Sequence, residues 1–169
     1  KFDKLHMAEQ VIFNDYERVL SGRGYIWSVS IPLLKKHFVL GSGADTFVMA
    51  FPQQDYLRLW RNGFSEQIMS KPHSLYLQVG VQDGVIALLG MLIFFVMYLG
   101  YSVRLYIASH FESFYERAGV AVMLAVLGFA VMGISNDSSI TVSPIFWVLA
   151  GLGVYLNGKS ARLIKSRKS

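Results

Sequence analysis

Two side chains in the first half of the chain have the chemistry of a group-transfer site. Arg23 stands in the run SGRGYIW at the start of a predicted helix. Its guanidinium could hold a phosphate through two hydrogen bonds, beside free helix N–H groups. His73 stands in KPHSLYLQ, between a proline and another predicted helix, and its imidazole could accept a proton from a hydroxyl group. The same positions also suit an ion-paired surface arginine and a helix-capping histidine, so residue type alone leaves both interpretations open.

Two glycines and a few aromatic residues are weaker candidates for binding a substrate. Gly41 and Gly43 could present backbone N–H groups to an anion, or could simply form a turn, because the Lys-Ser/Thr of a phosphate loop is missing. Tyr56, Trp60 and Tyr76 could stack on sugar rings or anchor the chain at a bilayer surface. We therefore take Gly41, Gly43 and Tyr76 as candidate substrate-binding residues.

The sequence predicts neither a metal site nor a cofactor. The chain has no cysteine, which excludes thiolate metal sites and disulfides. Its four histidines show no ligand spacing, and the candidate carboxylates Asp45, Asp55 and Asp83 are not paired in the sequence. There is also no G-x-S-x-G run to supply a serine nucleophile.

Three apolar segments predict a transmembrane region over residues 84–156. Residues 85–103 carry no charge, and at about 1.5 Å per residue this stretch covers roughly 28 Å, close to the hydrocarbon thickness of a bilayer. Residues 118–135 are also uncharged and rich in small residues that suit close helix packing. The third predicted span, residues 140–156, has Pro144 near its start, where a helix tolerates proline.

The net charge of +5 is concentrated at one end of the chain. Residues 1–83 hold nine Lys/Arg and eight Asp/Glu, whereas the last eleven residues hold five Lys/Arg and no acid. A short basic tail after an apolar segment is typical of a cytoplasmic end and argues against nucleic-acid binding. Residues 157–169 are therefore predicted to be a cytoplasmic tail.

The basic residues also predict the orientation of the other segments. Counting back from the tail across three spans puts the loop 136–143 outside, and this loop has no Lys or Arg. The loop 104–117 is then inside, and residues 1–83 form an extracytoplasmic domain. This assignment requires the third segment to span, because two spans would reverse it.

Residues 1–83 have the pattern of short helices, so the fold class is all-α, with a mostly helical loop domain before the transmembrane helices. Ser21 is a candidate helix cap, and Pro32 is expected to kink or shorten the helix that follows. The predicted helical segments are residues 22–36, 44–50 and 74–82, with a surface loop and one helical turn over 53–71.

The order of these motifs resembles the O-antigen ligase and O-antigen polymerase superfamily. The resemblance rests on SGRGYIW, then LGSGADTF, then KPHSLYLQVGVQDGVIALLG followed by membrane spans, and it covers about residues 20–100. It implies a polytopic glycosyltransferase of the bacterial plasma membrane that works without a metal ion. The donor would be a glycan on undecaprenyl diphosphate, and the acceptor a hydroxyl group of a glycan or a lipid.

The resemblance also implies roles for two residues. Arg23 matches the loop arginine that engages the diphosphate, and His73 matches the loop histidine that activates the acceptor hydroxyl. Such proteins have more than three spans, so the chain is expected to be a C-terminal fragment that is inactive alone. These motifs do not distinguish a ligase from a polymerase, because they do not determine which acceptor is used.

Two functions of other classes compete with the glycosyltransferase. A transporter or channel subunit would place polar or charged residues inside the spans, and the three predicted spans show essentially none. A non-catalytic membrane anchor with an outward-facing interaction domain would tolerate the loss of His73.

Overall fold

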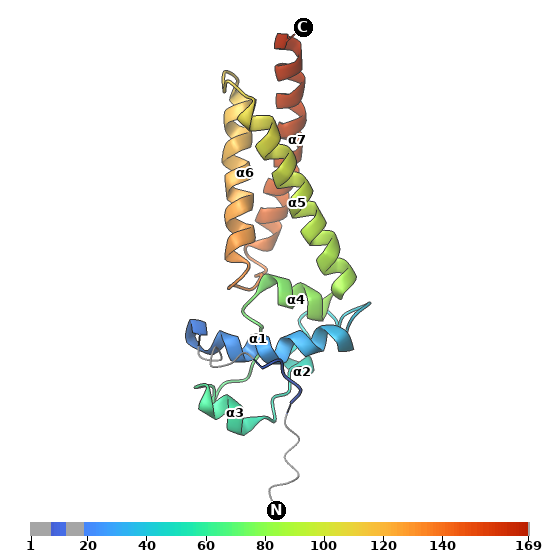
Figure 1. The fold of residues 1–169 in the computed structure, drawn as a ribbon, viewed down its shortest axis with the longest axis vertical. Helices are drawn as coiled ribbons and strands as arrows, with labels where there is room; N and C mark the ends of the chain where they lie inside the picture. Colours follow the sequence, from blue (N-terminus) through green and yellow to red (C-terminus); the bar gives the residue numbers. More distant parts are fainter. Residues whose placement is uncertain (1–7, 13–18, 169) are drawn as a thin grey trace, which may run out of the picture. The chain divides into compact units, whose positions relative to one another are not determined.

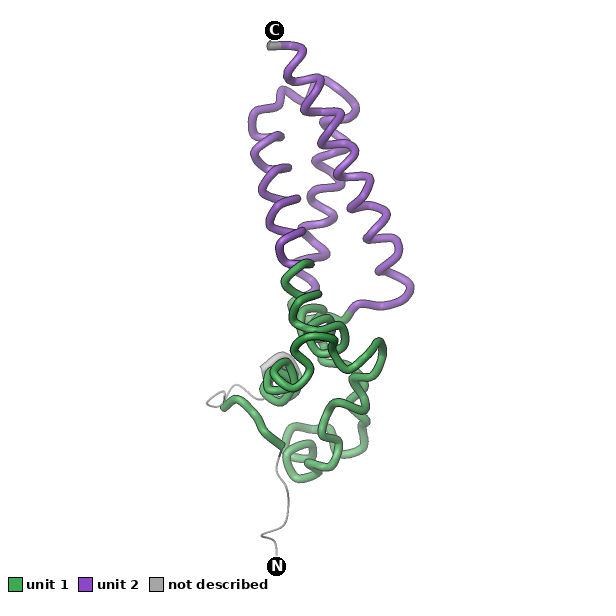
Figure 2. Tube along the Cα trace, turned by 90° about the vertical axis from the view of Figure 1, so that its right-hand side faces the viewer, with its two compact units in different colours: residues 1–90, 134–137 green, residues 91–133, 138–169 purple. Residues whose placement is uncertain are grey.

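The computed structural model describes residues 8–12 and 19–168, and within these residues the regular structure is helical throughout. The predicted all-α class is thereby confirmed. The chain divides into two compact units, which Figure 2 draws in different colours. Unit 1 contains residues 1–90 and 134–137, and unit 2 contains residues 91–133 and 138–169.

In the described part of unit 1, four helices lie before α5 (Val85–Ile107), each close to a segment with helical signals in the sequence. They are α1 (Val19–Lys36), α2 (Phe47–Ala50), α3 (Tyr56–Arg61) and α4 (Leu75–Gln82) (Figure 1). α1 contacts α4, and α2 contacts α4 as well. The predicted turn of helix within residues 53–71 is α3.

Two expectations about α1 were wrong. Ser21 is not its cap, because α1 begins at Val19, and both Ser21 and Gly22 take positive φ, 61° and 84°. Pro32 does not shorten the helix, which continues to Lys36. A proline lacks the N–H that would bond to the carbonyl four residues earlier. Here that carbonyl, on Ser28, accepts a hydrogen bond from the N–H of Val11 at 2.9 Å, so it is satisfied from outside the helix.

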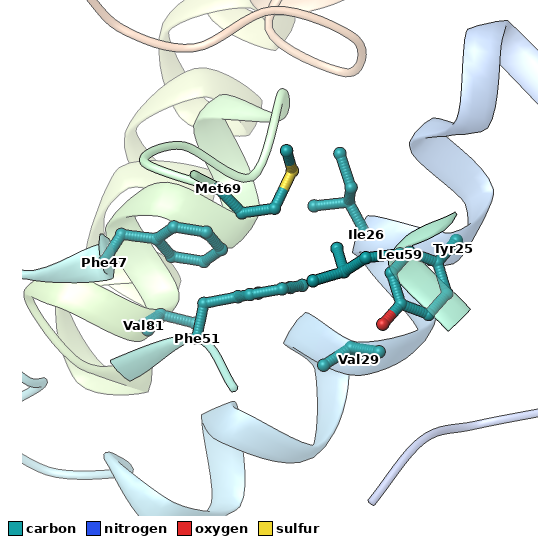
Figure 3. Packing of buried hydrophobic residues seen from close by; sticks show 8 residues of the cluster. All are labelled: Tyr25, Ile26, Val29, Phe47, Phe51, Leu59, Met69 and Val81. Atoms are coloured by element: carbon teal, nitrogen blue, oxygen red, sulfur yellow. The ribbon is translucent and has the colours of Figure 1, made fainter. Parts of the chain in front are cut away.

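A cluster of apolar side chains holds the helices of unit 1 together (Figure 3). α1 contributes Tyr25, Ile26 and Val29, which are at most 1% exposed. Burying a large apolar side chain stabilises a fold by about 1.5–3 kcal/mol, so the cluster fixes α1 against its neighbours. The other members come from α2, α3 and α4 and from the segments that follow α2 and α3: Phe47, Phe51, Leu59, Met69 and Val81.

Unit 2 is built from α5 (Val85–Ile107), which begins in unit 1, α6 (Phe114–Met132) and α7 (Ser143–Lys168). α5 and α6 are long and apolar enough to cross a membrane, and less than a third of their apolar stretches is buried (22% and 28%). Their outward faces are therefore apolar, as lipid contact requires. α7 is not among the helices that pass this test, and it continues through most of the predicted tail.

The three helices of unit 2 pack through both apolar and polar contacts. The rings of Phe129 and Phe146 stack at 3.8 Å between α6 and α7. Between α5 and α7, Asn157 accepts a hydrogen bond from the Tyr106 hydroxyl at 2.8 Å and donates one to Ser102 Oγ at 2.7 Å. A buried polar trio thus joins α5 to α7, and of its members only Ser102 lies inside a predicted span, since Tyr106 and Asn157 fall just beyond residues 85–103 and 140–156.

Candidate active site

His73 occupies a constrained position in the turn before α4. Its φ is 52°, a value that non-glycine residues rarely adopt. The neighbours on both sides, Pro72 and Ser74, are buried, whereas the His73 side chain is 44% exposed. Backbone strain of this kind costs about 1–3 kcal/mol and persists only where the surroundings enforce it. The fold thus holds one polar side chain toward solvent from an otherwise buried turn.

The imidazole of His73 is held by a carboxylate from a distant part of the chain. Asp137 Oδ2 lies 3.1 Å from His73 Nδ1, and its other oxygen accepts a hydrogen bond from the Ser74 N–H at 3.2 Å. Asp137 belongs to residues 134–137, the part of the loop after α6 that lies in unit 1. A carboxylate at Nδ1 fixes the tautomer that carries its proton there and leaves Nε2 as the basic nitrogen.

Trp27 connects α1 to the turn that carries His73. Its indole Nε1 donates a hydrogen bond to the carbonyl of Pro72 at 3.0 Å. Arg23 lies four residues before Trp27, so the two side chains emerge on the same face of α1, about 6 Å apart along the axis. The structure therefore places the turn of α1 that follows Arg23 against the segment that carries His73.

The guanidinium of Arg23 has no binding partner in the described part of the chain. It is half-buried and, among residues 8–12 and 19–168, it makes no hydrogen bond or ion pair. The residue before it, Gly22, packs against the ring of Phe64, and a Cβ there would lie 2.7 Å from that ring. Only a glycine fits this place, since φ is also positive. Gly22 thus lets α1 begin close to Phe64 with Arg23 directly following.

The glycines Gly41 and Gly43 do not offer free N–H groups. The N–H of Gly41 bonds to the His37 carbonyl at 3.2 Å, and that of Gly43 bonds to the Gln82 carbonyl at 2.9 Å. The intervening Ser42 N–H bonds to the Val81 carbonyl at 2.8 Å. These amides bond to the carbonyl that follows α1 and to the last two carbonyls of α4, so they connect the ends of the two helices. No N–H of this run is left for the expected anion binding.

Tyr76 lies in the first turn of α4, three residues after His73. Partial burial raises the pKa of its phenol, so the hydroxyl stays protonated through the physiological pH range. A neutral phenol can donate to or accept from a sugar hydroxyl. The other two aromatic candidates, Tyr56 and Trp60, are exposed on α3.

Acidic side chains in the described part of the chain do not gather around a metal position. No group of three His, Asp or Glu residues close enough to share an ion is found among residues 8–12 and 19–168. Asp55 is buried beside Arg58 at 3.5 Å. Asp83 stands at the end of α4, where partial burial raises the pKa of its carboxyl group.

Asp137 was missed in the sequence, although two signals pointed to it. It is the only acidic residue after Glu116, so it stands alone in a long acid-free stretch. The predicted topology also puts its loop on the same side of the membrane as His73. Neither signal gives a distance, because 63 residues lie between the two positions in the chain.

A model of the protein family described as O-antigen ligase matches residues 2–92 of the chain. That match covers 91 of the 169 residues, more than half, and includes Arg23 and His73 but not Asp137. No curated protein and no solved structure matches the chain.

Proposed function

Because the chain belongs to the O-antigen ligase family, we propose that it transfers a glycan from undecaprenyl diphosphate to the hydroxyl group of a glycan or lipid acceptor. The family makes it an O-antigen ligase-type membrane enzyme, whose partners are in general a lipid-linked glycan and an acceptor. Our proposal adds three points to this: the identity of the donor, the acceptor hydroxyl, and the role in cell-surface polysaccharide biosynthesis.

The pairing of His73 with Asp137 is the observation that carries the proposal. In the transfer, Nε2 of His73 takes the proton of the acceptor hydroxyl as its oxygen attacks the anomeric carbon. The positive charge that then forms on the imidazole is stabilised by the Asp137 carboxylate, 3.1 Å from Nδ1. A histidine that served only to cap α4 would need neither an exposed imidazole nor a strained backbone.

Arg23 is assigned to the leaving group. As the bond between the anomeric carbon and the phosphate oxygen breaks, its electron pair stays on the diphosphate, which gains negative charge. A guanidinium can neutralise this charge with two parallel hydrogen bonds. Among residues 8–12 and 19–168 no hydrogen bond or ion pair occupies the donors of Arg23, which supports this role.

The ion pairs at the two ends of the membrane helices support the proposed topology. His73 and Asp137 touch, and of the three helices between them in the chain, α4 is short while α5 and α6 have the length of a membrane span. Two crossings return the chain to the side from which it started. We therefore propose that both helices span the bacterial plasma membrane and that residues 1–83 and 134–137 share its extracytoplasmic side.

The same reasoning favours α7 as a third span. Arg167 Nη1 lies 3.0 Å from Glu116 Oε1, so the end of α7 and the start of α6 are on one side. If α6 crosses the membrane, α7 must cross it back. The basic residues that end α7 then face the cytoplasm, as the positive-inside rule requires.

The proposal is tested with the full-length natural protein in phospholipid vesicles that contain a glycan on undecaprenyl diphosphate. We expect glycan to appear on the acceptor together with an equal amount of free undecaprenyl diphosphate. His73→Ala should abolish both products, whereas His110→Ala, at an exposed position outside unit 1, should not. Unchanged transfer by the His73→Ala protein would reject the assignment and favour a non-catalytic anchor.

A further inference from the structure

The loop that follows α1 presents three apolar side chains in succession. Phe38 is 53% exposed, Val39 57% and Leu40 86%. Isolated exposed apolar residues are common, but a contiguous apolar tip indicates a contact with something apolar. We call residues 38–40 the apolar tip.

The apolar tip is fixed to the first residue of α5. The N–H of Val85 donates a hydrogen bond to the Phe38 carbonyl at 2.8 Å. Gly84, with φ of 94°, packs so closely on the Val39 carbonyl that any side chain there would collide with it. The adjoining Ser42 N–H is bonded to Val81. The tip therefore has a defined place beside the start of α5.

The start of α5 is also the start of its uncharged stretch. Residues 85–103 carry no charge, and α5 has the length and composition of a membrane span. In its first turns Ile86 and Leu89 are 58% and 51% exposed, so apolar side chains already face outward there. A tip held at Val85 thus lies at the depth where the hydrocarbon layer begins.

The residues before the tip have the chemistry of the headgroup layer. Lys35 and Lys36 end α1, and both are exposed. Long basic side chains next to an apolar insertion can reach the lipid phosphates while their stems stay among apolar groups.

We propose that the apolar tip inserts into the phospholipid bilayer beside α5, with Lys35 and Lys36 at the level of the phosphates. Unit 1 is then attached to the membrane at a second point in addition to α5. α1 runs from this anchor to Arg23 over 13 residues, about 20 Å. The inference concerns lipid contact alone and does not depend on the transfer reaction.

These 169 residues contain no cysteine. In the full-length protein, with any cysteine elsewhere replaced by serine, the variant Leu40→Cys is labelled with an environment-sensitive fluorophore and reconstituted in vesicles of zwitterionic phospholipid. Part of the lipid carries a nitroxide quencher on its acyl chain. Since Leu40 is 86% exposed, the substitution removes little packing.

Two further variants give the reference levels. Ile93→Cys, on the exposed face of α5, reports contact with acyl chains. Leu57→Cys lies on α3, which Figure 1 shows on the other side of α1 from α4, and it reports exposure to water. The label at position 40 should lose fluorescence to the nitroxide lipid as strongly as the label at 93, and the label at 57 should not.

Two outcomes would overturn the inference. A label at 40 that is unquenched by nitroxide lipid and quenched by aqueous iodide, like the label at 57, would put the tip in water. A label shielded from both quenchers, in vesicles and in detergent alike, would mean that protein covers the tip, either a second copy or another part of the enzyme.

Discussion

Two ion pairs join helix ends in this protein, and they differ in what they leave open. In unit 2, Arg167 bonds to both oxygens of Glu116, at 3.0 and 3.3 Å, and the Glu116 side chain is fully buried. Glu116 also accepts a hydrogen bond from the Ser113 N–H and closes a capping box with that residue. In unit 1, His73 contacts Asp137 through one nitrogen, and its side chain is 44% exposed.

The difference separates an interaction suited to stability from one suited to chemistry. A guanidinium keeps its charge at every accessible pH, so the Arg167–Glu116 pair is permanent once formed. An imidazole can take a proton from a bound hydroxyl group and pass it on, and the His73 side chain is 44% exposed. The strained backbone at His73 fits the same contrast, because the capping box around Glu116 is a regular and favourable arrangement.

The largest effect is expected from His73→Gln. The glutamine amide can still donate a hydrogen bond to Asp137, but it cannot accept a proton from the acceptor. Loss of a general base lowers the rate by about 10²–10⁴-fold, so kcat for glycan transfer should fall by that factor. The unfolding temperature in detergent should stay that of the wild type. If the His73→Gln protein is inactive because it unfolds, His73 would contribute to stability as Glu116 does, and the proposed difference between the two pairs would be wrong.

The next largest effect is expected from Arg23→Ala. Removing a donor that stabilises developing charge costs about 10²–10³-fold in kcat. Arg23→Lys keeps the charge but loses the two-pronged geometry, and it should recover only part of the rate. Arg61→Ala, at an exposed position on α3, is the matched control and should transfer glycan normally. If the Arg23→Ala and Arg61→Ala proteins transfer glycan at equal rates, Arg23 has no role in the site.

Asp137→Asn should have a smaller effect on the same step. A buried aspartate in a catalytic triad contributes about 10⁴-fold, and we expect about 10–100-fold here because the imidazole is half exposed. The loss should appear in kcat with KM for the donor unchanged, as expected for a residue that positions the base. Asp45→Asn, which changes an exposed carboxyl group, is the control. A loss confined to KM would contradict the positioning role.

The smallest effect on transfer is expected from Glu116→Gln, which tests the other side of the comparison. Glutamine can keep the capping box while the charge that faces Arg167 is lost. Hydrogen bonds to charged groups contribute about 1.5–3 kcal/mol, so stability should fall by an amount of that order. Glu112→Gln should change stability less, because that side chain is 64% exposed. Transfer per folded molecule should match the wild type for both.

Much of the fold was predictable because local signals were strong. The helices and their boundaries were indicated to within a few residues by two signals: the uncharged run of residues 85–103, and the helix-breaking residues Gly41, Pro52 and Pro72. The partner of the Ser28 carbonyl, which Pro32 leaves without its helical hydrogen bond, was not predictable, since that bond comes from Val11 outside the helix. The inside and outside assignment of the loops stays a prediction.

The candidate site was only half visible in the sequence. Arg23 and His73 stood out because their types and neighbours suggested phosphate binding and proton transfer. Asp137 did not, because a lone acid in a loop has no recognisable pattern until folding brings it to His73. The glycines at 41 and 43 misled for the opposite reason, since their N–H groups were predicted to be free but bond to carbonyls at the ends of α1 and α4.

The separation of His73 and Asp137 along the chain has a consequence for biogenesis. The carboxylate is synthesised only after α5 and α6, so a nascent polypeptide that stops within these helices carries the base without its partner. If both helices span the membrane, as proposed, their insertion must precede assembly of the His73–Asp137 pair. On the proposed mechanism, an incompletely inserted enzyme would consume little of the lipid-linked donor.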